Sequence, residues 1–151
     1  MKKIDIDTAP ERAGSRYPGG FHTTGMNKVR TLLADAAGLT QFGVHRLTLE
    51  PGAWSGQRHW HSAEDELIYV LGGEVTLITN AGPEILKAGD SAGFKAGEPD
   101  AHHFINHTDA PAVLLEIGTR NPEADTTTYP DIDLLMPAGR RGYLHKDGTP
   151  W

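Results

Sequence analysis

The sequence predicts an all-β protein whose strands form a closed or double-layered sheet. Glycine and proline are frequent, with 18 and 10 copies among 151 residues, which is typical of short strands joined by tight turns. From Gln41 onward, short segments of alternating apolar and polar residues are separated by turn pairs such as Pro51-Gly52 and Gly89-Asp90. About eight such strands favour a closed architecture, because closure removes the unpaired edges of a long sheet.

The chain is expected to divide into an N-terminal extension at 1–40, a barrel at 41–118 and a C-terminal arm at 119–151. Within the extension, residues 11–25 are rich in turn residues, and residues 26–40 are expected to form one or two helical turns. The expected barrel strands are 42–49, 53–60, 66–72, 74–80, 84–87, 91–95, 101–107 and 111–118.

The arm is too apolar for a free tail. Its apolar residues are Ile132, Leu134, Leu135, Met136, Tyr143 and Trp151. We expect the arm to pack on the barrel or on a partner subunit, and the outward-facing Trp60 and Tyr69 also need cover. A homodimer with two-fold symmetry would supply that cover. Arg120, Arg140 and Arg141 are expected in solvent or at an interface.

Composition excludes several classes of function. The net charge is −6 and there is no basic run, so binding to a nucleic-acid backbone is not expected. The chain has no cysteine, so a metal site must use histidine and carboxylate ligands. The first ten residues show no signal peptide, and no segment approaches the length of a membrane span, so we expect a cytoplasmic protein.

Two histidines at a strand end are the first candidate for chemistry. His59 and His61 are two residues apart, so on a strand both face one side and can converge on one ion. Glu66 follows where the next strand begins, on the same face as Ile68 and Val70. The competing interpretation is a polar strand end followed by a solvated acidic turn, which we expect for Glu64 and Asp65.

A second segment, at 89–108, combines a Gly-Asp turn, a Gly/Pro turn and further histidines. Alternation predicts that His102, Phe104 and Asn106 share one strand face, with His103 and His107 on the outward face.

Both segments resemble the two motifs of the cupin superfamily, G-x5-H-x-H-x(3,4)-E-x6-G and G-x5-P-x-G-x2-H-x3-N. The matching residues are Gly52, His59, His61, Glu66 and Gly73 in the first motif, and Gly89, Gly97, His102 and Asn106 in the second. This chain has one extra residue before His59, Lys95 in place of proline, and two extra residues before His102. The segments EDELIYVLGGEV, DAPAVLLEIGTR, YPDIDLL and HKDGTPW further resemble a group of small single-domain bacterial cupins, described as sugar-phosphate isomerases or as proteins of unknown function.

The resemblance implies a double-stranded β-helix, the cupin or jelly-roll barrel, with one divalent metal inside it. The implied ligands are His59, His61, Glu66 and His102. Three imidazoles and one carboxylate suit Zn, Fe, Mn, Ni or Co, and the sequence does not choose among them. The leading interpretation is a metal-binding enzyme with isomerase-type chemistry on a sugar or sugar phosphate. An Fe(II)-dependent dioxygenase and a non-enzymatic binding or sensing module are the alternatives.

Other residues are candidates for handling the ligand, which we expect to be small, polar and anionic. His45 faces inward with Leu47 and is a candidate proton shuttle, although a hydrogen-bonded wall histidine is slightly favoured. Arg46 and Arg58 flank the first motif and are candidates for binding an anionic group, with surface salt bridges as the alternative. Phe104 and Asn106 are expected in the wall of the ligand pocket.

Overall fold

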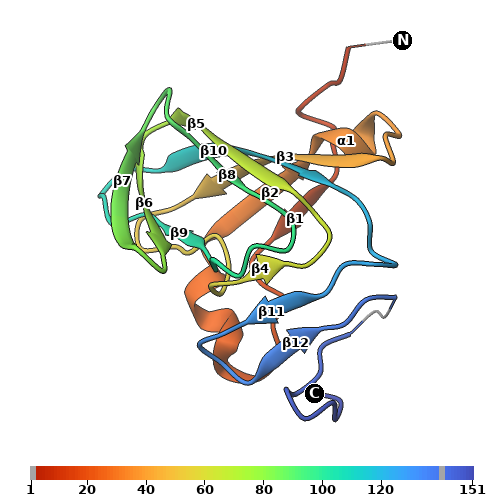
Figure 1. The fold of residues 1–151 in the computed structure, drawn as a ribbon. Coiled ribbons are helices and arrows are strands. Elements are labelled where there is room, and N and C mark those ends of the chain that lie inside the picture. Colours follow the sequence, from red (N-terminus) through yellow and green to blue (C-terminus); the bar gives the residue numbers. More distant parts are fainter. Residues whose placement is uncertain (1–2, 140–141) are drawn as a thin grey trace.

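The computed structural model describes residues 3–139 and 142–151, and Arg140 and Arg141 lie outside the described residues. Figure 1 shows the elements, which are β1 (Glu11–Ala13), the 3-10 helix η1 (Gly19–Gly25), β2 (Lys28–Leu32), α1 (Leu33–Ala36), β3 (Phe42–Leu49), β4 (Trp60–His61), β5 (Glu66–Gly72), β6 (Glu74–Thr79), β7 (Gly82–Lys87), β8 (Ser91–Phe94), β9 (His103–Ile105), β10 (Ala112–Thr119), β11 (Thr127–Tyr129) and β12 (Leu134–Met136). In the described part of the chain, no helix is long and apolar enough to cross a membrane.

The strands form three antiparallel sheets. The largest has six strands in the order β1-β2-β3-β10-β5-β8, and two three-stranded sheets have the orders β7-β6-β9 and β12-β11-β4. In Figure 1 the six-stranded sheet lies above, with β7, β6 and β9 at one side and β4, β11 and β12 below. The predicted all-β barrel is confirmed, because neighbours in the sheets are mostly strands from distant parts of the sequence.

The predicted strands at 42–49 and 66–72 are confirmed, whereas the one at 53–60 is largely wrong. Only Trp60–His61 is a strand there, preceded by single bridges from Trp54 to Ile105 and from His59 to His102. The Ser55 hydroxyl accepts the Phe104 N–H at 3.0 Å, so a side chain takes the place of a regular ladder bond.

The segment expected as an extension supplies two strands to the main sheet. We expected helical turns across 26–40, but Lys28–Leu32 is strand β2, and only Leu33–Ala36 forms one turn of helix. Strand β2 pairs with β3, with Lys28 opposite Leu49 and Leu32 opposite His45. The alternation in KVRTL, with its β-branched Val29 and Thr31, outweighs the helical signal.

An apolar core occupies one end of the barrel, between the six-stranded sheet and the β6 sheet. It consists of Leu47, Leu49, Ala53, Ile68, Val70, Val75, Leu77, Leu86, Phe104, Ala112 and Leu114. The turn after β5 depends on Gly73, which has a φ of +77°. A Cβ there would lie 2.9 Å from the Pro111 carbonyl oxygen and the Ala112 Cα, so only glycine fits.

The arm packs on its own barrel. Strand β11 pairs with β4 on one side and with β12 on the other, which attaches the arm beside the histidine pair. Leu134 is fully buried within the chain, and Ile132, Leu135 and Met136 are partly buried, so the chain itself covers much of this apolar stretch.

Candidate metal centre

Four side chains predicted as metal ligands converge inside the barrel. His61 comes from β4, Glu66 from the start of β5, and His59 and His102 from the residues just before β4 and β9. The backbones of His59 and His102 exchange two hydrogen bonds, of 3.1 and 2.9 Å, which brings the two motif segments together. One ligand atom each of His59, His61 and Glu66 lies within 4.8 Å of the other two.

The first two histidines present the same ring nitrogen to this group. Nδ1 of His59 donates to the Gln57 carbonyl at 2.8 Å, and Nδ1 of His61 donates to Asp125 at 2.7 Å. Since a carbonyl and a carboxylate can only accept, both Nδ1 atoms carry the proton and both Nε2 lone pairs remain available. Burial, assisted by His102, lowers the pKa of His59 to about 3, so the ring is neutral, as a metal ligand must be.

His102 and Glu66 complete the donor set. The His102 ring stacks on Phe94, with centroids 3.4 Å apart, and its Nε2 lies 2.8 Å from Oε2 of Glu66. Burial raises the pKa of Glu66, but the hydrogen bond to His102 outweighs this effect and keeps that pKa below its ordinary value. Two donors at about 2.1 Å from one ion, at right angles, lie about 3 Å apart, so this pair fits a shared ion.

A cavity of about 290 Å³ opens beside these donors. Its far wall consists of inward-facing residues of the six-stranded sheet, including Arg30 from β2, His45 from β3 and Glu116 from β10. Gly43 and Gly118 lie opposite each other in neighbouring strands and also line it. A Cβ on Gly118 would lie 3.2 Å from the Asp65 carbonyl oxygen, so this position has little room for a side chain.

Arg30, Glu116 and His45 form a charged group on the far wall. Nε and Nη2 of Arg30 donate to the two oxygens of Glu116 at 2.6 and 2.8 Å, and Nδ1 of His45 lies 3.6 Å from Oε2 of the same carboxylate. Although burial alone would raise it, Arg30 holds the pKa of Glu116 down at about 2. His45 thus lies in the cavity wall beside a carboxylate that stays ionised.

The other residues predicted to contact ligand lie in different environments. Phe104 is buried and lines the cavity. Arg46 lies on the outward side of β3, and its buried Nε has no hydrogen-bond partner among the described residues. Arg58 makes a two-pronged bond with Asp131, at 2.7 and 2.8 Å. Asn106 is fully buried, and its amide donates to the Leu49 and Ala110 carbonyls, so it holds a turn together.

His103 corrects an expectation about the strand faces. We expected it on the outward face of the strand, opposite His102, but the residue is buried, with Nδ1 donating to the Gly56 carbonyl at 3.1 Å and its ring edge-on to Trp54. Alternation placed it on the side opposite His102, but the irregular chain at 54–56 covers that side.

Three residues of the site had not been identified from the sequence. Arg30 was missed because its segment was expected to be helical. Glu116 was recoverable, because it alternates with the inward Ala112 and Leu114, and a carboxylate on a buried face needs a partner. Asp125 lies in a segment of the arm with no periodic signal, and only the pairing of β11 with β4 brings it to His61.

The comparisons agree with the fold. A family model for the cupin domain matches residues 45–118. A crystal structure of a cupin-superfamily sugar phosphate isomerase from Silicibacter pomeroyi is 41% identical, with a TM-score of 0.92, over 99% of this chain and 96% of that one. A second, from Acidithiobacillus ferrooxidans and only provisionally described as a sugar phosphate isomerase, is 32% identical, with a TM-score of 0.72, over 80% and 77%.

More distant structures share the fold alone. The polyketide cyclase RemF from Streptomyces resistomycificus is 19% identical, with a TM-score of 0.64, over 79% of each chain. No protein with curated functional information matches the sequence. The domain match, the long alignments at 41% and 32% identity and the histidine–glutamate group together establish that the chain belongs to the cupin superfamily.

Proposed function

We propose that this cupin is a metal-dependent enzyme that isomerises a small hydroxy-carbonyl compound of the sugar type. The observation that carries the proposal is the cavity, which has the histidine–glutamate group on one wall and His45, beside the ionised Glu116, on the other. The 41% identity to a protein described as a sugar phosphate isomerase supports the reaction class.

The metal would be held by His59, His61, Glu66 and His102. A divalent ion bound there supplies a Lewis acid that polarises a carbonyl and its neighbouring hydroxyl. Three neutral imidazoles and one carboxylate are compatible with Zn, Fe, Mn, Ni or Co.

His45 would move the proton. It takes a proton from the carbon next to the carbonyl and returns it to the former carbonyl carbon, while the hydroxyl proton passes to the former carbonyl oxygen, so no proton is gained or lost overall. Glu116 stabilises the imidazolium formed in between, and Arg30 keeps Glu116 ionised throughout. Phe104 and Ile68 cover the apolar side of the cavity and keep water from the reacting carbons.

The charges of the lining favour a neutral sugar over its phosphate. Two arginines and four carboxylates line the cavity. Arg30 is paired with Glu116, and Arg120 is paired with Asp35, so neither arginine is left for a phosphate. Glu64, Asp65 and Glu66 are paired with neither arginine, so an anionic group entering the cavity would have only the divalent ion to bind.

The test is isomerisation in D₂O by protein loaded with each candidate metal, followed by proton NMR of aldoses, ketoses and their phosphates. Metal-dependent interconversion with deuterium uptake at the carbon next to the carbonyl supports the proposal. Oxygen consumption with diketone or aromatic substrates would support a dioxygenase instead. Metal-dependent ligand binding without turnover of any substrate would support a binding module. Chelator-treated protein is the control for all three outcomes.

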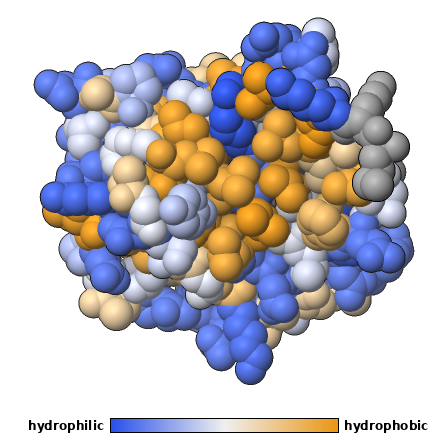
Figure 2. Space-filling model, turned by 90° about the horizontal axis from the view of Figure 1, so that it is seen from above, coloured by the Kyte–Doolittle hydropathy of each residue, from blue (hydrophilic) through white to orange (hydrophobic). Residues whose placement is uncertain are grey.

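We also propose a homodimer formed through the outer face of the six-stranded sheet. Leu67, Tyr69 and Leu71 alternate with the inward residues of β5 and are 40–48% exposed, and Phe42 on β3 is 41% exposed. Figure 2 shows a continuous apolar area on the side of the molecule where β3, β10 and β5 lie. Light scattering should give about twice the chain mass of 16.4 kDa, and Tyr69→Glu should shift the protein to monomer.

A further inference from the structure

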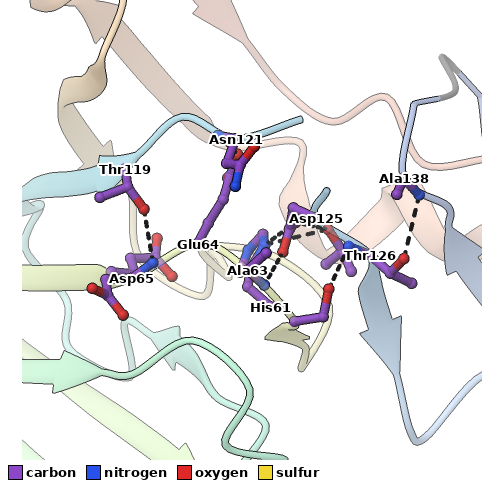
Figure 3. A network of polar contacts seen from close by, with 12 residues as sticks. His61, Ala63, Glu64, Asp65, Thr119, Asn121, Asp125, Thr126 and Ala138 are labelled. Atoms are coloured by element: carbon purple, nitrogen blue, oxygen red, sulfur yellow. Dashed lines mark hydrogen bonds and ion pairs between the residues drawn. The ribbon is translucent and has the colours of Figure 1, made fainter. Parts of the chain in front are cut away.

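The C-terminal arm makes a direct polar contact with a candidate metal ligand. Asp125, just before β11, is buried, and its Oδ2 accepts the Nδ1–H of His61 at 2.7 Å. Its Oδ1 accepts the backbone N–H of Ala63 at 2.9 Å. Figure 3 shows both bonds meeting at this one carboxylate, which therefore fixes the ring and the chain that follows it.

Neighbouring contacts hold the same two segments in register. Thr127 is the strand partner of His61, and the backbone N–H of Ser62 donates to the Thr126 carbonyl at 3.1 Å. The Thr126 N–H donates in return to the Ser62 hydroxyl at 2.7 Å. These hydrogen bonds hold the backbone next to Asp125 in a fixed position, so its short side chain lies close to the His61 imidazole.

The arm also contacts the second histidine of the pair. Tyr129 of β11 is buried and stacks on the His59 ring, with centroids 5.7 Å apart and planes inclined by 30°. Both histidines of the first motif therefore contact the arm, whereas Glu66 and His102 contact each other.

His61, Glu64 and Asp125 also form a group that could hold an ion of its own. The hydrogen bonds of Asp125 and Glu64 indicate which of the two groups His61 belongs to. Asp125 already accepts from His61 and Ala63 with its two oxygens, and Oε1 of Glu64 accepts the Asn121 N–H. These carboxylates act as acceptors for N–H groups, which leaves Nε2 of His61 for the group with His59 and Glu66.

We infer that Asp125 is a positioning residue for the metal centre, so that the arm is part of that centre rather than a cover on the barrel. Its carboxylate selects the His61 tautomer with the proton on Nδ1 and directs the free Nε2 toward the ion. Such partners of ligating histidines change metal affinity by about 10–100-fold when they are removed. The inference rests on the proposed metal site.

The experiment compares Asp125→Asn with the wild type and with Asp131→Asn, a control on the same arm. Asp131 is more than half exposed and pairs with Arg58, and none of its hydrogen bonds among the described residues is to His59 or His61. An asparagine has an acceptor oxygen at only one of the two carboxylate positions and an NH₂ donor at the other, so it cannot replace both Oδ2, which accepts from His61, and Oδ1, which accepts from Ala63. We expect Asp125→Asn to weaken Zn²⁺ and Co²⁺ binding by about 10–100-fold in chelator competition, and Asp131→Asn to change it by less than about twofold.

A second readout needs no metal. Nitrogen-15 NMR of the histidine rings in chelator-treated wild type should show His61 protonated on Nδ1, and Asp125→Asn should lose that preference. Equal affinity in Asp125→Asn, or a wild type protonated on Nε2, would overturn the inference. A drop from two bound ions to one would also overturn it, by assigning Asp125 to a second ion. A wild type that binds no metal refutes the proposed function, while the tautomer measurement still tests the role of Asp125.

Discussion

Strands β3, β10 and β5 each contribute to the apolar core at one end and to the cavity at the other. Along the inward face of β3, Leu49 and Leu47 are followed by His45 and Gly43, and along β10 Ala112 and Leu114 are followed by Glu116 and Gly118. Strand β5 repeats the change, from Val70 and Ile68 to Glu66. Alternation decides which residues face inward, and the order along that face decides which end is core and which is cavity.

The two ends also differ in their effect on stability. Each large side chain at the apolar end removes its surface from water, a gain of about 25 cal/mol per Å². At the other end, glycines are among the residues that line the cavity, and Glu116 is buried against Arg30. A buried ion pair of this kind often stabilises a protein less than an apolar pair of equal size. Substitutions at the two ends should therefore separate stability from function.

Truncation at the apolar end should have the largest effect on stability. Leu114 is fully buried in the core, so Leu114→Ala should lower the free energy of unfolding by about 2–5 kcal/mol, because a cavity replaces its contacts. Denaturant unfolding monitored by circular dichroism measures the loss. Ile85→Ala is the control, since Ile85 is 59% exposed and should lose less than about 0.5 kcal/mol. Similar losses in both variants would contradict the assignment of the core.

Breaking the ion pair on the far wall should have the next largest effect. Glu116→Gln keeps the shape but leaves the Arg30 charge without its carboxylate. We expect a loss of about 3 kcal/mol, the lower end of the range for buried pairs, because the Arg30 side chain is 21% exposed. Glu74→Gln, which removes the exposed partner of Lys87, should cost less than about 1 kcal/mol. An unchanged unfolding midpoint in Glu116→Gln would show that the pair adds nothing to stability.

The apolar end was easier to predict from the sequence than the cavity end. The inward assignment of Ile68 and Val70 on β5 is confirmed, because alternation within one strand needs only local information. The grouping of His59, His61 and Glu66, with His102 2.8 Å from Glu66, was also expected, but through the resemblance of two motifs and not through periodicity.

Residues that act through distant pairings were not predictable in this way. Arg30 reaches the cavity only because β2 joins β3, and Asp125 reaches His61 only because β11 joins β4. The alternation in KVRTL favours a strand but does not indicate which strand it joins, and the segment around Asp125 has no alternation at all. Arg58 was an attractive candidate by its position next to the motif, but its guanidinium is held by Asp131.

A smaller effect, dependent on pH, is expected at Lys28, which lies opposite Leu49 of the apolar end. Burial, assisted by Arg30, lowers the pKa of this lysine from 10.5 to about 7. Between these two values the unfolded chain holds a proton that the folded chain has released, so stability rises as pH rises. Relative to Lys28→Met, the wild type should gain on the order of 2 kcal/mol between pH 7 and pH 9. Parallel pH profiles of the two proteins would contradict the lowered pKa.

The smallest effect on stability is expected at His45, which should instead have a large effect on activity. The side chain is partly exposed to the cavity and lies 3.6 Å from Glu116, too far for a strong hydrogen bond, so His45→Gln should change the free energy of unfolding by less than about 0.5 kcal/mol. If His45 moves the proton, kcat for isomerisation should fall by about 10²–10⁴-fold while metal content stays the same. Leu114→Ala, assayed well below its unfolding temperature, should show the reverse pattern, with lost stability and nearly unchanged kcat. If His45→Gln retains kcat, His45 is only part of the cavity wall and another group transfers the proton. If His45→Gln instead lowers the free energy of unfolding, the two ends do not differ in their effect on stability.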